Sequence, residues 1–328
     1  MESPEWLVDY YSSVMDVVSP SCGLSTAVAS FVLITMYKDT SSTMSVRVSG
    51  LLGLTDALSH ICRLISRELA LTSPSSSSSA RTFAFFTYFL QLVNIFLNNR
   101  IALDLQINFL GWFACSRFLR FVLKHYMRVT VCVAFVLSVP LVFAQAEFDK
   151  VYLYPQWTFG STTRNIVFVC LSFYVWVGIL LINFAVVILA VVVKLRKRVP
   201  SVSARETLAA PAMRHLEQRM RRKARILVLY PLSAVVFFGP SLVFYWVQAL
   251  RLERSRFTRT VWTVTMVVGP VQAVYDFGVF VVLPPVQRVV KWNCELQKES
   301  EEPLFGARGE GANVPMSSEE AWAQDVGS

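Results

Sequence analysis

Charged residues are scarce in this chain of 328 residues. Asp, Glu, Lys and Arg make up 16% of it, whereas soluble domains typically contain about 25%. Hydrophobic residues amount to 54%, which is more apolar surface than a soluble fold can hide but which a bilayer accepts. The formal net charge of +9 does not indicate a nucleic-acid partner, because the Lys and Arg residues cluster between apolar runs, as at the flanks of membrane spans. We therefore expect an integral membrane protein.

Signals of other protein classes are missing. Residues 1–37 contain no Lys or Arg, so the basic start of a cleavable signal peptide is absent. The six cysteines form no CxxC pair, which argues against a zinc or redox site. No nucleophile elbow, metal-ligand spacing or phosphate loop indicates an enzyme, and residues 260–284 lack the Lys that a retinal pump needs. We expect no catalytic residue, no metal and no cofactor.

Long apolar runs, in contrast, are frequent. A membrane helix needs about 20 mostly apolar residues. Seven runs are interpreted as spans: 17–37, 46–69, 82–104, 128–147, 165–193, 226–249 and 260–284. The run 46–69 is the weakest, because ionisable residues interrupt it, but its neighbours require the chain to change sides there. The predicted fold is an all-α membrane protein, a seven-transmembrane helix bundle over residues 17–284.

The Lys and Arg residues of the loops predict the orientation of this bundle. With the N-terminus outside, the inner segments hold 21 of these residues and the outer segments hold 8. The loop 194–225 carries most of the difference. Residues 1–16 are then a short extracellular N-terminus.

The segment after the last span has apolar residues at helical spacing. We expect residues 285–298 to form a short amphipathic helix on the inner membrane surface. Cys294 within it is a candidate for palmitoylation, although an unmodified cysteine is at least as compatible with the sequence. The polar residues 299–328 are predicted to be a disordered cytoplasmic tail.

One face of the span 46–69 is polar. Asp56, His60, Arg63 and Arg67 are spaced four, three and four residues apart, which places them on one side of an α-helix. Ionisable groups at membrane depth cost at least ~2.5–3.5 kcal/mol each and face the bundle interior. One interpretation is that these four residues line a ligand cavity. The other is that Asp56 pairs with His60 or Arg63 inside the bundle, while Arg67 reaches the lipid headgroups.

Two further spans carry polar residues. Gln91, Asn94 and Asn98 share a face of the span 82–104, as ligand contacts or as interhelical hydrogen bonds. Gln272 and Asp276 lie in the last span. Asp56 and Asp276 would share a proton or hold a cation such as sodium if they meet, and a helix-packing hydrogen bond is the simpler account.

Arginine residues also gather at the predicted outer ends of the spans. Arg251, Arg254 and Arg256, together with Arg63 and Arg67, would form a positive vestibule. This pattern favours a small anionic ligand, and contact with lipid phosphates is the competing interpretation.

Prolines interrupt the last two spans. Pro231 and Pro240 lie in 226–249, and Pro270 lies in 260–284. Each removes a backbone hydrogen bond and can kink its helix. Kinked helices are natural hinges for a two-state switch.

Three short patterns sharpen the interpretation. Residues 101–106 read Ile-Ala-Leu-Asp-Leu-Gln, with Asp104 at the fourth position; Tyr230 precedes Pro231; and Pro270-Val271-Gln272-Ala273 is followed by Asp276. These resemble the G-protein-coupled receptor group that joins slime-mould cyclic-AMP receptors to fungal carbon-sensing receptors. In that group the position of Asp276 is Asn and that of Ala273 is Gly. Asp104 is not followed by the Arg of the rhodopsin-like Asp-Arg-Tyr switch.

The resemblance implies a plasma-membrane receptor that binds a small molecule and drives nucleotide exchange on a heterotrimeric G protein. Basic residues at the inner ends of the spans are candidates for contact with that G protein, and anionic lipids would attract the same residues. These candidates are Arg117, Arg120, Lys124, Arg221, Arg222 and Lys223.

Two other functions compete with this one. Asp56, His60 and Asp276 would also suit an ion- or proton-coupled transporter or channel, although the chain has no internal repeat of the kind that many transporters have. A receptor-like scaffold that no longer signals is the third interpretation, because the motif around Asp104 departs from the rhodopsin-like pattern.

Overall fold

The computed structural model describes residues 5–36, 40–72, 78–112, 117–143, 147–149, 154–156, 173–196, 210–249 and 256–289. The chain divides into two compact units, Met1–Gln287 and Arg288–Ser328. All elements named below belong to the first unit. The predictions for Cys294, for Arg251 and Arg254 and for the tail 299–328 lie outside the described residues.

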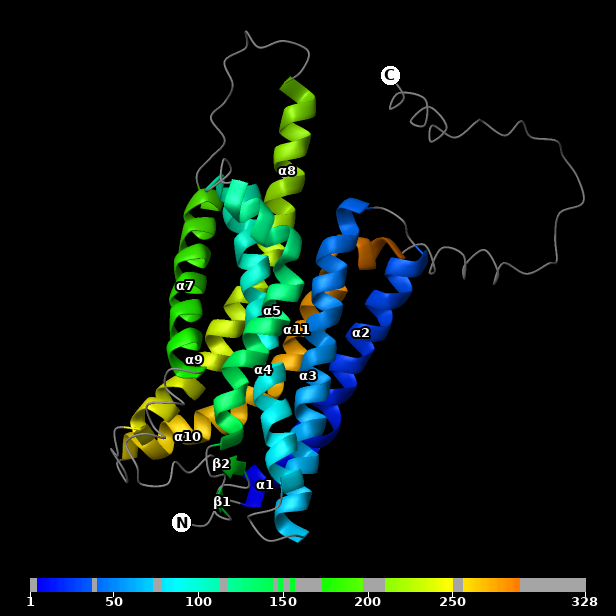
Figure 1. Ribbon diagram of the computed structural model, residues 1–328. Helices are drawn as coiled ribbons and strands as arrows, with labels where there is room; N and C mark the ends of the chain where they lie inside the picture. The colour runs from blue at the N-terminus through cyan, green and yellow to red at the C-terminus, as the bar shows by residue number, and fades with distance from the viewer. Residues whose placement is uncertain are drawn as a thin grey trace, which may run out of the picture. The chain divides into compact units, whose positions relative to one another are not determined.

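The described residues are almost entirely helical, as expected (Figure 1). The first rod consists of α1 (Glu5–Ser13), the π-helical turn η1 (Val14–Val18) and α2 (Ser19–Met36), followed by α3 (Thr40–Thr72). Next come α4 (Ser78–Asp104) with the π-helical turn η2 (Leu105–Leu110), α5 (Arg117–Phe143) and α7 (Val175–Arg196). The last elements are α8 (Ala210–Leu227), α9 (Leu229–Ala249), α10 (Arg256–Val268), the 3-10 turn η4 (Gly269–Val271) and α11 (Gln272–Val282).

The two described strands form a small hairpin. β1 (Glu147–Asp149) pairs antiparallel with β2 (Tyr154–Gln156), and Phe148 lies opposite Pro155. Figure 1 shows the hairpin at the lower end of the bundle, near α1, while α8 extends from the upper end.

Five helices in the described part of the chain are long and apolar enough to cross a membrane. They cover Glu5–Met36, Met44–Ser66, Val175–Arg196, Gln218–Val243 and Thr263–Val282. The weakest predicted span, 46–69, is among them. The expected spans 82–104 and 128–147 correspond to α4 and α5, which are helical but do not belong to these five.

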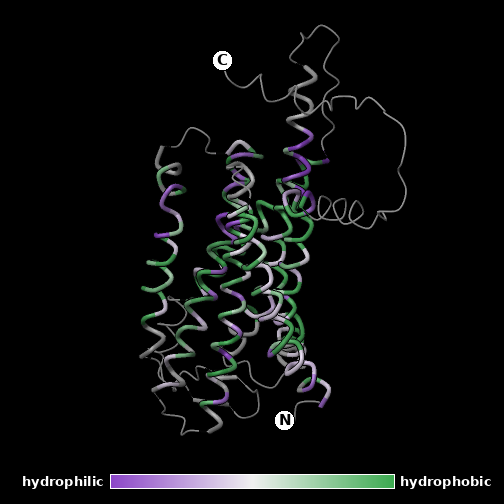
Figure 2. Tube along the Cα trace, turned by 90° about the vertical axis from the view of Figure 1, so that its right-hand side faces the viewer, coloured by the Kyte–Doolittle hydropathy of each residue, from purple (hydrophilic) through white to green (hydrophobic). Residues whose placement is uncertain are grey.

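The helices pack side by side with their apolar faces outward. α3 lies between α2 and α4, while α9 contacts α7, α10 and α11. Apolar side chains such as Phe135, Val136, Ile182 and Leu189 are exposed. Such a surface suits lipid tails rather than water. Figure 2 shows hydrophobic residues along the middle of the bundle and hydrophilic residues on α8.

Among the described helices, α2 and α3 approach each other closely through small residues. An added Cβ at Gly50 would lie 1.7 Å from Ser30 Oγ, and one at Gly53 would lie 2.6 Å from Thr26 Cβ. Membrane helices approach this closely only where small residues face each other. The contact fixes α3 against α2 and so orients the opposite face of α3.

Two helix interruptions have clear local causes. η2 ends at Gly111, whose φ of +80° is left-handed, and the Trp112 N–H then donates to the Gln106 carbonyl at 2.8 Å. Glycine adopts this conformation without penalty. Between α10 and α11, Pro270 has no N–H, and the chain forms a 3-10 turn in which Gln272 N–H donates to the Gly269 carbonyl.

The structure describes parts of the first and last predicted segments. The segment 1–16 was expected to precede the first span, but from Glu5 onward it is helical and continuous with α2. At the other end, residues 284–289 are helical, and residues 290–298 of the expected helix 285–298 lie outside the described residues.

Candidate functional site

Buried polar side chains from four helices meet in the bundle interior. We call this group, Asp56 on α3, Asn94 and Asn98 on α4, Ser233 on α9, and Gln272 and Asp276 on α11, the polar centre. All six are buried, with exposed fractions between 0% and 7%. A bilayer provides no water to solvate such groups, so the hydrogen bonds among them determine the free-energy cost of burying them.

Asn94 connects three helices within the polar centre. Its Nδ2 donates to Asp56 Oδ1 at 2.9 Å. Its Oδ1 accepts from Gln272 Nε2 at 3.3 Å and from Asn98 Nδ2 at 3.1 Å. One amide therefore bridges α3, α4 and α11, and the expectation of a joint polar face is met for Asn94 and Asn98.

The second carboxyl group of the centre is held by α9. Ser233 Oγ lies 3.0 Å from Asp276 Oδ1 and 2.7 Å from the carbonyl oxygen of Tyr230. The carboxyl groups of Asp56 and Asp276 are close enough to interact electrostatically. A hydroxyl has one proton, so Ser233 donates to only one of its two acceptors at a time.

Tyr230 extends the polar centre toward the start of α9. This side chain is fully buried, and its hydroxyl donates to Ser49 Oγ on α3 at 2.7 Å. A continuous series of contacts thus runs from Ser49 through Tyr230 and Ser233 to Asp276. The Tyr-Pro pattern of the sequence is tied to the polar centre through these contacts.

Several atoms of this region have no hydrogen-bond partner among the described residues. They are Asp56 Oδ2, Asp276 Oδ2, Asn98 Oδ1 and His60 Nδ1. Buried polar atoms without a partner are rare and costly. The carboxylate and amide oxygens are acceptors, so the centre has unused capacity for a group that brings protons or positive charge. No group of three or more His, Cys, Asp or Glu in the described ranges is arranged to hold a metal ion.

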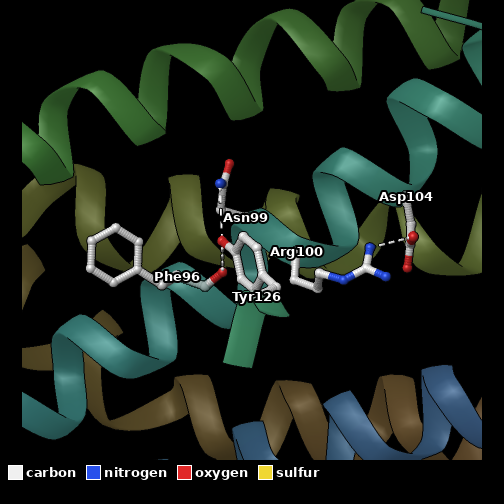
Figure 3. Close-up of polar contacts among 5 residues, drawn as sticks. All are labelled: Phe96, Asn99, Arg100, Asp104 and Tyr126. Atoms are coloured by element: carbon white, nitrogen blue, oxygen red, sulfur yellow. Dashed lines mark hydrogen bonds and ion pairs between the residues drawn. The ribbon is translucent and has the colours of Figure 1, made fainter. Parts of the chain in front are cut away.

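A second polar group lies further along α4. We call Asn99, Arg100, Asp104, Gln106, Tyr126 and Asn183 the inner polar cluster. Arg100 forms an ion pair with Asp104 one turn later, and its Cζ lies 6.0 Å from the centre of the Tyr126 ring (Figure 3). Arg100 is only 7% exposed. The Arg that pairs with Asp104 therefore precedes it by four residues.

Hydrogen bonds join the inner polar cluster across α4, α5 and α7. The Tyr126 hydroxyl donates to the Phe96 carbonyl at 2.7 Å and accepts from Asn99 Nδ2 at 3.1 Å (Figure 3). Asn183 Nδ2 donates to Asn99 Oδ1 at 3.0 Å, and Gln106 Nε2 donates to Asn183 Oδ1 at 2.8 Å. Asn99 and Asn183 therefore each donate and accept a hydrogen bond, whereas Gln106 acts as a donor.

The remaining predicted ligand residues lie beyond the polar centre, toward the C-terminal end of α3 and the N-terminal end of α4. His60 is buried one turn beyond Asp56 on α3. Arg63 interacts electrostatically with both Asp56 and His60. Gln91 is half-buried and makes no hydrogen bond within the described part of the chain. The side chain of Arg67 lies outside the described residues.

The candidates for partner contact are placed in part. On α8, Arg222 and Lys223 are exposed, while Arg221 is half-buried with its Nη1 3.4 Å from the Leu195 carbonyl. Lys124 on α5 is exposed. The side chains of Arg117 and Arg120 lie outside the described residues.

Sequence reasoning missed Ser49, Ser233 and most of the inner polar cluster. Ser49 and Ser233 are small residues that apolar helices tolerate anywhere, so no sequence signal marks them. Asn183 had a usable signal, because it is an amide within the long apolar run 165–193. A second usable signal was the spacing of four residues between Arg100 and Asp104, because residues this far apart are neighbours on one helical face.

Family models and curated proteins were compared with this chain, and neither comparison gives a match.

Proposed function

We propose that this chain is a cell-surface G-protein-coupled receptor that senses a small ligand at the plasma membrane and activates a heterotrimeric G protein. Seven rods cross the membrane: α1–α2, α3, α4, α5, α7, α8–α9 and α10–α11. The N-terminus and the β1–β2 hairpin lie outside, and the α8–α9 rod enters the membrane from the cytoplasm, with α8 as its cytoplasmic end. The basic residues of α8 support this orientation, since Lys and Arg accumulate on the cytoplasmic side.

The continuous contact route from the polar centre to Tyr230 carries this proposal. The Ser233 hydroxyl donates either to Asp276 Oδ1 on α11, at 3.0 Å, or to the Tyr230 carbonyl on its own helix, at 2.7 Å. A change at Asp276 therefore alters the hydrogen bonding at the start of α9. Pro231 lies where this route enters α9, and Pro240 lies about two turns after Ser233. Both weaken α9, and Pro270 does the same for the last rod. Signalling consists of a rearrangement of these two rods.

The G protein binds at the cytoplasmic end of α8 and α9. The backbone runs from α8 into α9 without a loop, since Val228 N–H donates to the Ala224 carbonyl at 3.0 Å. A movement of α9 is thereby transmitted to the exposed Arg222 and Lys223. Exposed basic residues favour an acidic partner surface and speed its encounter.

The ligand binds outward of the polar centre, near Arg63 and His60. The polar centre offers unpartnered acceptors, which repel an anion, whereas the outer turns of α3 carry positive charge. A small anionic ligand is therefore held at Arg63, and it acts on the centre through the electrostatic interaction of Arg63 with Asp56. Binding there changes the charge balance of the centre.

The decisive experiment measures nucleotide exchange on a purified heterotrimeric G protein with the full chain in lipid nanodiscs. Anionic metabolites and nucleotides are screened first. An activating compound should lose its effect with Arg63→Glu and keep most of it with Arg63→Lys. No stimulation by any compound, together with no basal exchange above that of empty nanodiscs, would refute the receptor assignment.

A transporter or channel is the second candidate, and the unpartnered acceptors in the polar centre and at the adjacent His60 favour it. Asp56 Oδ2, Asp276 Oδ2 and His60 Nδ1 are the groups that a proton or small cation would use. Ion- or pH-gradient-driven flux into liposomes that contain the chain would support this function. Flux that disappears with Asp276→Asn, in a protein without exchange activity, would replace the receptor assignment.

A further inference from the structure

The N-terminal helix packs against the outer half of the last rod. Leu7, Tyr11 and Met15 are 2–3% exposed and form a small apolar cluster, against which Val267 of α10 packs. These three residues are spaced four apart, so they form one face of the α1–η1 segment. The segment is thus part of the bundle rather than a free extension.

Two hydroxyl groups, one from this segment and one from the first residue of α2, bind the backbone at the helix interruption. The Tyr10 hydroxyl donates to the Val267 carbonyl at 2.5 Å. Ser19 Oγ, which is fully buried, donates to the Pro270 carbonyl. The acceptors are the residue before α10 ends and the proline within η4.

The helix interruption changes the backbone hydrogen bonding around these two acceptors. Pro270 has no N–H, so it cannot donate to the carbonyl one turn earlier. The following bond is shifted to the 3-10 pattern, with Gln272 N–H on the Gly269 carbonyl. Carbonyl groups near such a break take up other donors, because buried backbone groups are rarely left unpaired.

The position of the break matters for the polar centre. Gln272 is the first residue of α11, directly after η4, and Asp276 follows one turn later. Gln272 Nε2 donates to Asn94 Oδ1, and Asp276 accepts from Ser233. A small rotation at η4 would therefore move both side chains relative to α4 and α9.

We propose that residues Glu5–Ser19 are an intramolecular clamp that holds the Gly269–Val271 turn and thereby positions Gln272 and Asp276. Tyr10 and Ser19 are positioning residues, since they touch the backbone of the turn and none of the groups in the polar centre. Release of the clamp loosens the turn and shifts the last rod away from its resting arrangement. The clamp itself does not depend on the proposed function, whereas its effect on signalling does.

Hydrogen–deuterium exchange of the full chain in nanodiscs tests the clamp directly. Ser19→Ala and Tyr10→Phe each remove one hydroxyl without changing the packing. We expect amide exchange in peptides covering 267–277 to become about 2- to 10-fold faster, as expected for loss of one hydrogen bond in a local opening. Ser19→Thr keeps a hydroxyl and should restore slow exchange.

Two serines on the same rod provide matched controls. Ser12 Oγ and Ser21 Oγ contact only their own helix, at the Asp9 and Val17 carbonyls, and both residues are exposed. Ser12→Ala and Ser21→Ala should leave exchange in 267–277 unchanged. Equal exchange in Ser19→Ala, Tyr10→Phe and these controls would overturn the clamp.

Nucleotide exchange by the same variants separates the clamp from the receptor assignment. Faster exchange of deuterium together with altered basal G-protein activation supports both. Faster deuterium exchange without any G-protein activation, in the unmodified chain as well, supports the clamp and refutes the receptor.

Discussion

The two sides of α3 are built on different principles. Toward α2 the helix presents Gly50 and Gly53, and the contact is too close for any larger side chain. Toward α4 and α9 it presents Asp56 and Ser49, which hold their neighbours by single hydrogen bonds. Two closely packed helices can adopt only one arrangement, because the repulsion energy rises steeply when either helix shifts. Hydrogen-bonded side chains, in contrast, can exchange their partners. We infer that α2–α3 is the fixed part of the bundle and that movement occurs across the polar face.

The largest loss of stability is expected from Gly50→Ala. Its new Cβ would lie 1.7 Å from Ser30 Oγ, and that oxygen is already bonded to the Ala27 carbonyl of its own helix. Overpacking of this kind costs about 1–3 kcal/mol, and we expect the upper part of that range in thermal unfolding of the purified protein.

A matched glycine and a second-site change sharpen that test. Gly239 on α9 has no atom within 4 Å of an added Cβ, so Gly239→Ala should be neutral or slightly stabilising. Ser30→Gly in the Gly50→Ala chain should recover part of the loss. Equal unfolding temperatures for Gly50→Ala and Gly239→Ala would disprove the close contact.

The next largest effect is expected from Asn94→Ala in the polar centre. The change removes the donor to Asp56 and the acceptor shared by Gln272 and Asn98. Loss of a buried partner costs about 1–3 kcal/mol, and we expect the lower part of that range in total, because Gln272 can donate instead to an acceptor that has no partner, such as Asp276 Oδ2. We expect a lower unfolding temperature together with altered basal nucleotide exchange. Gln91→Ala, three residues earlier on the same helix, should change neither property, and a similar result for both variants would contradict the bridging role of Asn94.

Tyr230→Phe should have a smaller effect, since it removes one neutral hydrogen bond. Such a bond contributes about 0.5–1.5 kcal/mol to stability. Ser49→Ala removes the same bond from the other side, so the double variant should lose less than the sum of the two single variants. Additive losses in unfolding experiments would show that the two hydroxyl groups act independently.

The smallest effect on stability is expected on α8. Arg222→Gln with Lys223→Gln changes exposed side chains, and such substitutions usually stay within about 0.5 kcal/mol. Nucleotide exchange on the G protein should nevertheless fall, because the positive surface for the partner is reduced. Unchanged exchange would exclude these two residues as the contact.

Sequence patterns predicted the helices and the inward polar faces correctly, but not which residues meet. Gln91, Asn94 and Asn98 share one helical face, yet only Asn94 and Asn98 reach the polar centre. Gln91 lies roughly 4.5 Å further along the axis than Asn94, at 1.5 Å per residue, and it is only half-buried, without a hydrogen bond to the described residues of α3 or α11. Periodicity in the sequence predicts which side of a helix is polar, but the neighbouring helices determine which of these polar residues form contacts.

The sequence alone determined that the chain forms apolar helices with polar faces turned inward. The reason is local, since a backbone in lipid must satisfy its own hydrogen bonds and helical periodicity follows from residue spacing. Only the tertiary structure decided that Asn94 bridges Asp56 and Gln272, and that Tyr10 and Ser19 bind the turn at Pro270. These contacts join residues up to 257 positions apart in the sequence. They depend on how each helix is rotated against its neighbours, and close packing, such as that at Gly50, determines this rotation.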